Sequence, residues 1–151
     1  GGTVQCVVFS NTSGRMYAVG GEAQLRWRPG RFTMLDATYS FVWLGGADIT
    51  GGAYPAHLAS VRGMVPIKDG LLRLSAQGVF QSARRAQDGT MTGEAFLINV
   101  GFSGEYAFLR YFAGVQNLLD QRPVVPVLSE IAFSKVPQYG RTFYGELAAS
   151  F

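Results

Sequence analysis

Residues that could carry acid–base or nucleophilic chemistry are few and scattered in this sequence. His57 is its one histidine and Cys6 its one cysteine, so neither a histidine cluster for a metal nor an internal disulfide is available. A catalytic group would have to join His57 to Ser60 or Asp48, and the residues around them do not resemble a nucleophile elbow. We therefore expect no catalytic residue, metal site or cofactor, and predict that the protein is not an enzyme.

Charged side chains occur singly, at alternating positions of segments with strand periodicity, instead of in runs. A net charge of +3 spread in this way does not favour nucleic acid as a partner. Such side chains could contact a ligand or another domain, or they could line a wet interior and pair with one another across strands. The polar candidates are Glu22, Arg26, Asp36, Arg62, Arg73, Arg110 and Glu146.

The composition is unusual for a soluble chain of 151 residues. Hydrophobic residues make up 48% and charged residues only 15%, whereas soluble domains carry about 25% charged residues. No segment has the roughly 18 uninterrupted apolar residues of a transmembrane helix. Only helices and closed barrels satisfy their backbone groups in lipid, so a chain of this composition that crosses a bilayer must do so as a barrel.

Alternation of apolar and polar residues with a period of two predicts an all-β, antiparallel, up-and-down transmembrane β-barrel fold of about eight strands. The expected strands are 3–10, 16–28, 31–43, 56–67, 71–83, 95–102, 107–117 and 142–151. In 31–43, for example, Leu35 and Tyr39 alternate with Asp36 and Ser40. Charged and amide side chains lie at mid-strand on the polar face, which is typical of a water-filled interior. The apolar face carries aromatic residues near strand ends, as interfacial girdles do, at Trp27, Trp43, Tyr106 and Phe151.

The connections between these strands alternate in length. Tight turns are expected at 28–30, 68–70 and 103–105, where glycine or proline favours a hairpin. Long connections are expected at 44–55, 84–94 and 118–141, and a short one at 11–14. Outer-membrane barrels have short periplasmic turns and long extracellular loops, so this alternation agrees with the membrane interpretation.

Several segments resemble the C-terminal third of TonB-dependent receptors. Residues 19–29 (VGGEAQLRWRP) followed by 37–41 (ATYSF) are similar to that family's G-x-E … P … x-Y-S strand pair. Residues 54–57 (YPAH) resemble the proline-containing entry to the next strand. Residues 114–120 (GVQNLLD) resemble V-x-N-L-F-D, with Leu119 in place of phenylalanine, and 137–141 (PQYGR) with a terminal Phe151 resemble the P-x-x-G-R … F ending. The resemblance covers about residues 14–151.

The resemblance implies the last strands of a barrel of about 22 strands that encloses a plug domain. Such receptors sit in the outer membrane of Gram-negative bacteria and import ferric siderophores, cobalamin or other scarce nutrients with energy delivered through TonB. Neither a plug domain nor a TonB box occurs in 1–151, so we expect these residues to be the C-terminal part of the receptor barrel. The implied partners are outer-membrane lipid, the plug and remaining strands, TonB and a small-molecule nutrient.

The last expected strand also resembles the C-terminal signal that the barrel assembly machinery reads. Its apolar members are Phe143, Leu147 and the terminal Phe151. The general signal places glycine five residues before the end, where this chain has Glu146. We expect this strand to serve both as an assembly signal and as a closing strand with an interfacial aromatic residue.

Two other hypotheses remain open on the sequence alone. One is an autonomous eight-stranded outer-membrane barrel that acts as an anchor or adhesion scaffold; the other is a soluble ligand-binding β-barrel. The receptor hypothesis predicts that strands 3–10 and 142–151 are not neighbours. The membrane hypothesis predicts that Leu25, Tyr39, Leu74, Tyr111 and Leu147 lie on the convex side of the sheet, away from Glu22, Asp36, Arg73 and Arg110.

Overall fold

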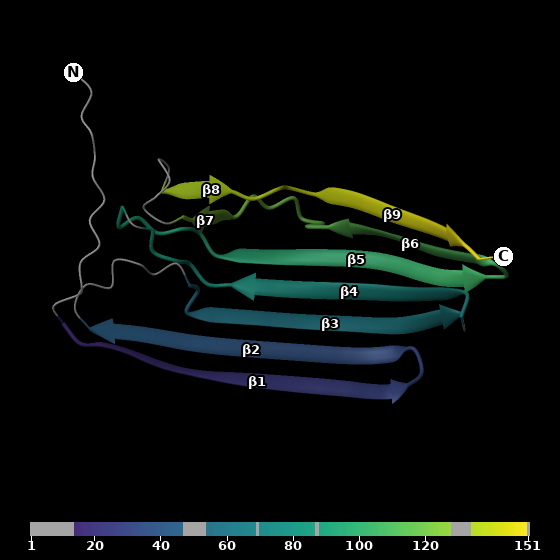
Figure 1. The fold of residues 1–151 in the computed structure, drawn as a ribbon, viewed down its shortest axis with the longest axis horizontal. Helices are drawn as coiled ribbons and strands as arrows, with labels where there is room; N and C mark the ends of the chain where they lie inside the picture. Colours follow the sequence, from purple (N-terminus) through teal and green to yellow (C-terminus); the bar gives the residue numbers. More distant parts are fainter. Residues whose placement is uncertain (1–13, 47–53, 69, 87, 128–133, 151) are drawn as a thin grey trace, which may run out of the picture.

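The computed structural model describes residues 14–46, 54–68, 70–86, 88–127 and 134–150, and this part of the chain contains strands but no helix. A seven-stranded antiparallel sheet has the order β1-β2-β3-β4-β5-β6-β9 (Figure 1). Two short strands, β7 and β8, form a separate ribbon. The strands are β1 Met16–Gly30, β2 Thr33–Gly46, β3 His57–Lys68, β4 Leu72–Gln81, β5 Ala95–Tyr106, β6 Leu109–Gln116, β7 Val124–Pro126, β8 Lys135–Pro137 and β9 Thr142–Ala149.

The all-β, antiparallel fold is confirmed, and seven of the expected strands appear. The expected strand 3–10 and the terminal Phe151 lie outside the described residues. Within the described part, the sheet is not closed into a barrel, because β1 and β9 form its two opposite edges. The β7–β8 ribbon lies within 118–141, which was expected to be a long connection.

Two of the three expected tight turns are displaced. Arg28, Pro29 and Gly30 belong to β1, and the turn is formed by Arg31 and Phe32, with Gly30 paired to Thr33. The register is irregular between Trp27 and Gly30, because proline has no N–H to offer the ladder. Residues 103–105 likewise belong to β5, and the chain turns only after Tyr106.

This second displaced turn consists of Ala107 and Phe108, between the paired residues Tyr106 and Leu109. Ala107 adopts a positive φ of 51° there. The expected turn after Lys68 is present, with Gly70 at a φ of 69°. Gly104 lies within β5, where a Cβ would clash with the Leu71 carbonyl oxygen and with the ring of its cross-strand partner Tyr111, so this position of the strand requires glycine.

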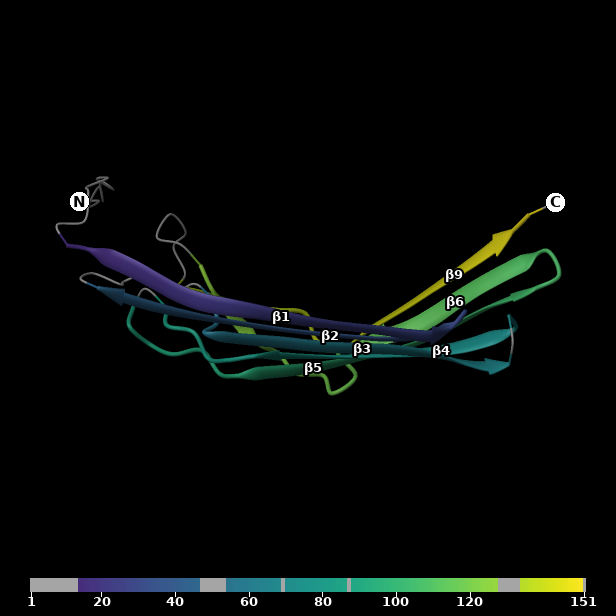
Figure 2. The ribbon, with the colours of Figure 1, turned by 90° about the horizontal axis from the view of Figure 1, so that it is seen from below.

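The short turns of the described residues, β1–β2, β3–β4 and β5–β6, lie at one end of the sheet, together with the end of β9 (Figure 1). The connections β2–β3, β4–β5 and β6–β9 lie at the opposite end. This distribution agrees with the expected alternation of short and long connections. Figure 2 shows the seven strands as a single curved layer.

Because the sheet is one layer, it has almost no hydrophobic core. Among the described residues, only Ala86 and Ala95 are buried hydrophobic side chains, and no large side chain is fully buried. A sheet normally hides its apolar face against a second layer of secondary structure. Here large apolar side chains along most of the sheet remain exposed.

The register separates apolar from polar residues across all seven strands, since directly paired residues lie on the same face of a sheet. Followed through the pairings, one face carries Leu25, Tyr39, Leu74, Tyr111 and Leu147. We call this the apolar face. The opposite face, called the polar face, carries Glu22, Asp36, Arg73 and Arg110. The expected separation is confirmed; the assignment of the apolar face to the convex side stays a prediction.

Candidate functional site

All seven polar candidates lie on the polar face, and the structure brings most of them into two groups. In the first, the Arg26 guanidinium donates to the Asp36 carboxylate with an Nε–Oδ2 distance of 3.0 Å. The Gln24 amide lies 3.5 Å from the other carboxylate oxygen, and Arg62 is the direct cross-strand partner of Asp36 on β3. Asp36 is only 7% exposed. These contacts agree with cross-strand pairing on a polar surface.

The second group lies near the short turns. Arg73 forms an ion pair of 3.1 Å with Glu105, and its guanidinium also lies 4.5 Å from the centre of the Phe32 ring. Glu105 is the direct partner of Arg110, and Arg110 and Glu146 line one shallow hollow. A role for these groups in contacting a plug or a ligand stays a prediction.

Glu22 and the three expected assembly-signal residues remain to be placed. Glu22 lies apart from both groups, opposite Ser40. Of the expected assembly-signal residues, Phe143 and Leu147 lie on the apolar face of β9, with exposures of 72% and 71%. Phe151 lies outside the described residues.

A row of amide side chains on the polar face was not singled out from the sequence. Gln77 donates to Ser60 at 3.4 Å, Asn99 donates to Gln77 at 3.1 Å, and the backbone N–H of Asn117 donates to Asn99 at 2.9 Å. The row therefore crosses from β3 to the end of β6. Gln77 and Asn99 are direct cross-strand partners, and this register, which alternation alone does not give, is what brings their side chains together.

Asn117 is the centre of a second set of hydrogen bonds, at the point where β6 ends. Its side-chain amide donates to the carbonyl oxygens of Gln121, at 2.5 Å, and Tyr139, at 3.3 Å, while its own oxygen accepts the N–H of Gln121 at 3.0 Å. Asn117 is 6% exposed and has a positive φ of 53°. Burial is tolerated because every polar atom of this amide side chain has a partner.

Asp120 adds a parallel connection. Its carboxylate oxygen Oδ1 accepts the backbone N–H of Arg141 at 2.7 Å, immediately before β9 begins. We call the contacts of Asn117 and Asp120 with 139–141 the loop staple. It joins two segments singled out in the sequence, 114–120 and 137–141, and it closes the base of the connection between β6 and β9.

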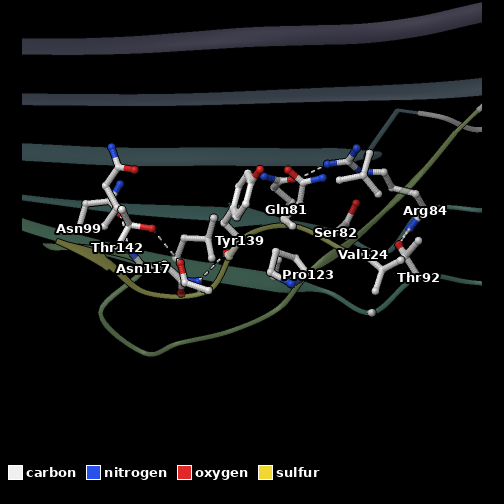
Figure 3. Close-up of a pocket in the computed structure, with 17 residues that line it drawn as sticks. Gln81, Ser82, Arg84, Thr92, Asn99, Asn117, Pro123, Val124, Tyr139 and Thr142 are labelled. Atoms are coloured by element: carbon white, nitrogen blue, oxygen red, sulfur yellow. Dashed lines mark hydrogen bonds between the residues drawn. The ribbon is translucent and has the colours of Figure 1, made fainter. Parts of the chain in front are cut away.

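A cavity of about 670 Å³ lies on the polar face beside the loop staple, at the end of the sheet with the long connections (Figure 3). Its wall comes from the end of β4, the start of β5, the end of β6, β7 and the segment before β9. The sequence did not predict this cavity, because β7, which helps to line it, lies in 118–141, a segment expected only to be a long connection. Its lining includes the polar side chains of Gln81, Gln116 and Gln138 and the apolar side chains of Leu97, Val124 and Val125.

The connection between β4 and β5 is also ordered by hydrogen bonds. Arg84 and Thr92 face each other, with the Thr92 N–H donating to the Arg84 carbonyl at 2.8 Å. The Asp88 carboxylate accepts bonds from the Thr90 hydroxyl and N–H and, at 2.8 Å, from the Ser134 hydroxyl. These bonds, the Thr90 hydroxyl first, lower the pKa of Asp88 from 3.8 to about 2.

His57 has a structural environment on the apolar face. Its Nδ1 lies 2.8 Å from the Tyr39 hydroxyl, and its ring stacks against Phe41. Ser60 lies on the opposite face of β3, so the His57–Ser60 pair considered from the sequence is not formed. Asp48 lies outside the described residues.

Within the described ranges, no group of three or more histidine, cysteine, aspartate or glutamate side chains is arranged to hold a metal ion. The same part of the chain has no helix that is long and apolar enough to cross a membrane. Comparisons of the chain with family models, with curated proteins and with solved structures found no match.

Proposed function

We propose that this sheet is a wall of an outer-membrane β-barrel, with lipid against the apolar face and water against the polar face. The observation that carries the proposal is the exposed apolar face. Its large exposed side chains include Tyr17, Val19, Leu25, Trp27, Tyr39, Trp43, Val61, Val65, Leu74, Phe96, Phe102, Tyr106, Phe143 and Leu147.

An apolar surface that extends across seven strands is too large to leave in water. Soluble monomers rarely expose contiguous apolar patches of more than a few hundred Å², and each buried Å² of such surface is worth about 25 cal/mol. The described residues provide no second layer to cover this face. Lipid hydrocarbon would cover the apolar face, while the hydrogen bonds between antiparallel strands pair the backbone N–H and C=O groups.

The spacing of aromatic residues fits the thickness of a bilayer. Tyr17 and Trp27 lie ten residues apart on the same face of β1, which is roughly 33 Å at about 3.3 Å per residue. At a strand tilt of about 40°, this length projects to roughly 25 Å along the membrane normal. That is about the height of the apolar band in outer-membrane barrels. Phe96 and Tyr106 have the same spacing on β5. Tyr17 packs edge-on against Trp43, with ring centroids 5.4 Å apart, as part of one girdle.

Within this class we propose the C-terminal part of a TonB-dependent receptor, which takes up a scarce nutrient such as a ferric siderophore or cobalamin. The motif segments 114–120 and 137–141 support this assignment, since they meet in the loop staple and so act as one unit. Strands β1 and β9 are the edges of the described sheet, which leaves room for further strands. The plug domain, TonB, the barrel assembly machinery and a Gram-negative outer membrane are the implied partners and location.

The lipid assignment can be tested with fluorophores on adjacent residues of opposite faces. Val100→Cys and Gln77→Cys, each in a Cys6→Ser background, would be labelled in the full product of the gene, reconstituted in lipid vesicles. Val100 pairs with Ala76, the residue next to Gln77, so the two labels lie at similar depths. We expect nitroxide-bearing lipids to quench the Val100→Cys label and aqueous iodide to quench the Gln77→Cys label. Equal quenching of both labels by iodide would overturn the membrane proposal.

The receptor assignment needs a separate test. The coding sequence immediately upstream of Gly1 should encode a plug domain followed by the earlier strands of the barrel. An unrelated upstream sequence, combined with a positive lipid result, would favour the autonomous eight-stranded barrel instead.

A further inference from the structure

The cavity beside the loop staple has the size of a small-molecule site. Its volume of about 670 Å³ lies within the range of about 300–1,000 Å³ typical of ligand pockets. The ends of β4, β5 and β6 line one part of it, and β7 with the segment before β9 lines the rest (Figure 3). The position of this segment is fixed, because the loop staple holds Tyr139 and Arg141 against the end of β6.

The cavity lining is almost entirely neutral. No aspartate or glutamate is among the described residues that line it, and Arg84, its one cationic side chain, donates a hydrogen bond to the Gln81 amide oxygen. Amides and hydroxyls make up its polar part, and Leu97, Val124 and Val125 contribute apolar patches. A side-chain amide both donates and accepts hydrogen bonds, as a ligand hydroxyl does.

Three lining side chains are placed to receive a ligand. In the described part of the chain, the side-chain amides of Gln116 and Gln138 make no hydrogen bond, and both residues are exposed. Tyr139 is 92% exposed although it lines the cavity, so its ring face is not used in packing. A tyrosine ring offers an apolar face and a polar tip. A pyranose ring has the matching surfaces, with a C–H face and a rim of hydroxyls.

We propose that this cavity binds an uncharged, hydroxyl-rich small molecule of the sugar class. The Tyr139 ring stacks on the C–H face of the ligand, and Gln116 and Gln138 bond to its hydroxyls. The biological role of this site rests on the proposed function: in a nutrient receptor, sugars would be the class of nutrient that is captured.

Isothermal titration of the full product of the gene in detergent tests the proposal. The probes are the neutral disaccharides maltose, cellobiose and chitobiose, with ferric citrate as an anionic comparator. We expect one disaccharide to bind and ferric citrate not to bind at this site. Tyr139→Ala should weaken the disaccharide about tenfold or more through loss of the stacking face. Tyr54→Ala is the matched control, since Tyr54 is also exposed at 72% but does not line the cavity, and it should leave the affinity unchanged.

Two results would overturn the proposal: no binding of any of the three disaccharides at millimolar concentration, or equal effects of Tyr139→Ala and Tyr54→Ala. Circular dichroism of both variants would show whether a loss of binding reflects a loss of folding, in which case Gln138→Ala replaces Tyr139→Ala. The lipid-quenching test is independent. Sugar binding without lipid quenching would support the sugar site and contradict the membrane proposal. Lipid quenching without sugar binding would contradict only the sugar site.

Discussion

Asp36 and Arg26 illustrate what the charges of the polar face contribute. The carboxylate side chain is 8% exposed, but the guanidinium side chain paired with it is 53% exposed. An ion pair that is open to water on one side adds about 0–1 kcal/mol to stability. Such pairs therefore do not hold the sheet together; their effect is to make the surface compatible with water. Compatibility with water is what the interior of a water-filled barrel requires. Because only the polar face has this property, the same substitution should have different effects on the two faces of one strand.

Arginine placed on adjacent residues of β1 measures this difference. Ala23→Arg puts a guanidinium on the apolar face about midway between Tyr17 and Trp27, and should destabilise the membrane-inserted protein by roughly 2–4 kcal/mol. Gln24→Arg puts it on the polar face beside Asp36, and should cost much less. Urea titrations of unfolding from lipid vesicles give both values. Equal costs for the two variants would contradict a lipid-facing apolar side.

At the scale of elements, the sequence predicted what depends on alternation. Seven strands of the sheet follow from period-two patterns that are eight to fifteen residues long. The same alternation assigned all seven polar candidates to one face. This succeeds because a shift of one residue would move every side chain of a strand to the wrong face.

Features that depend on contacts between distant segments were not predicted. β7 and β8 have three residues each, which is too short for a period to appear. Glycine and proline at 28–30 and 103–105 favoured turns, but pairing along two long strands outweighed these local preferences. The cavity and the bonds of Asn117 were missed for a related reason. The bonds of Asn117 join residues up to 22 positions apart, and the cavity lining extends from Gln81 to Thr142.

The connection between β4 and β5 should respond to acid. The pKa of Asp88 is lowered in the folded protein from 3.8 to about 2. Its hydrogen bonds therefore contribute fully to the order of this connection above about pH 4, and their contribution is lost as the pH falls through about 2. NMR titration of the Thr90 amide shift, in detergent micelles, should show a midpoint near 2. Asp88→Asn should abolish the titration, and a midpoint near 3.8 would show that the bonds from Thr90 and Ser134 are absent in solution.

At the scale of the whole molecule, the receptor and the small-barrel hypotheses differ in one neighbour relation. An autonomous eight-stranded barrel must pair its first and last strands with mutually consistent tilt and shear. The receptor hypothesis places other strands between them. Because an open edge in lipid leaves backbone groups unpaired, the answer also determines whether residues 1–151 can be stable alone in a membrane.

Disulfide trapping can decide this relation. The native Cys6 lies in the expected strand 3–10, and cysteines introduced one at a time at Tyr144, Gly145 and Glu146 sample β9. We expect no disulfide between Cys6 and these positions under mild oxidation of the full product of the gene. Ala113→Cys with Gly145→Cys, in a Cys6→Ser background, is the positive control because these residues are direct partners. Ready formation of a Cys6 disulfide would favour the small barrel.

The loop staple also has a consequence for how such a protein can diversify. Asn117 and Asp120 fasten the chain at 139–141, so the two ends of the excursion between β6 and β9 are held together whatever lies between them. Substitutions, insertions and deletions within 122–138 can therefore accumulate without shifting the register of the flanking strands. The staple thus separates the part of the chain that forms a wall of the cavity from the paired strands of the sheet, so the wall can change while the strands keep their register.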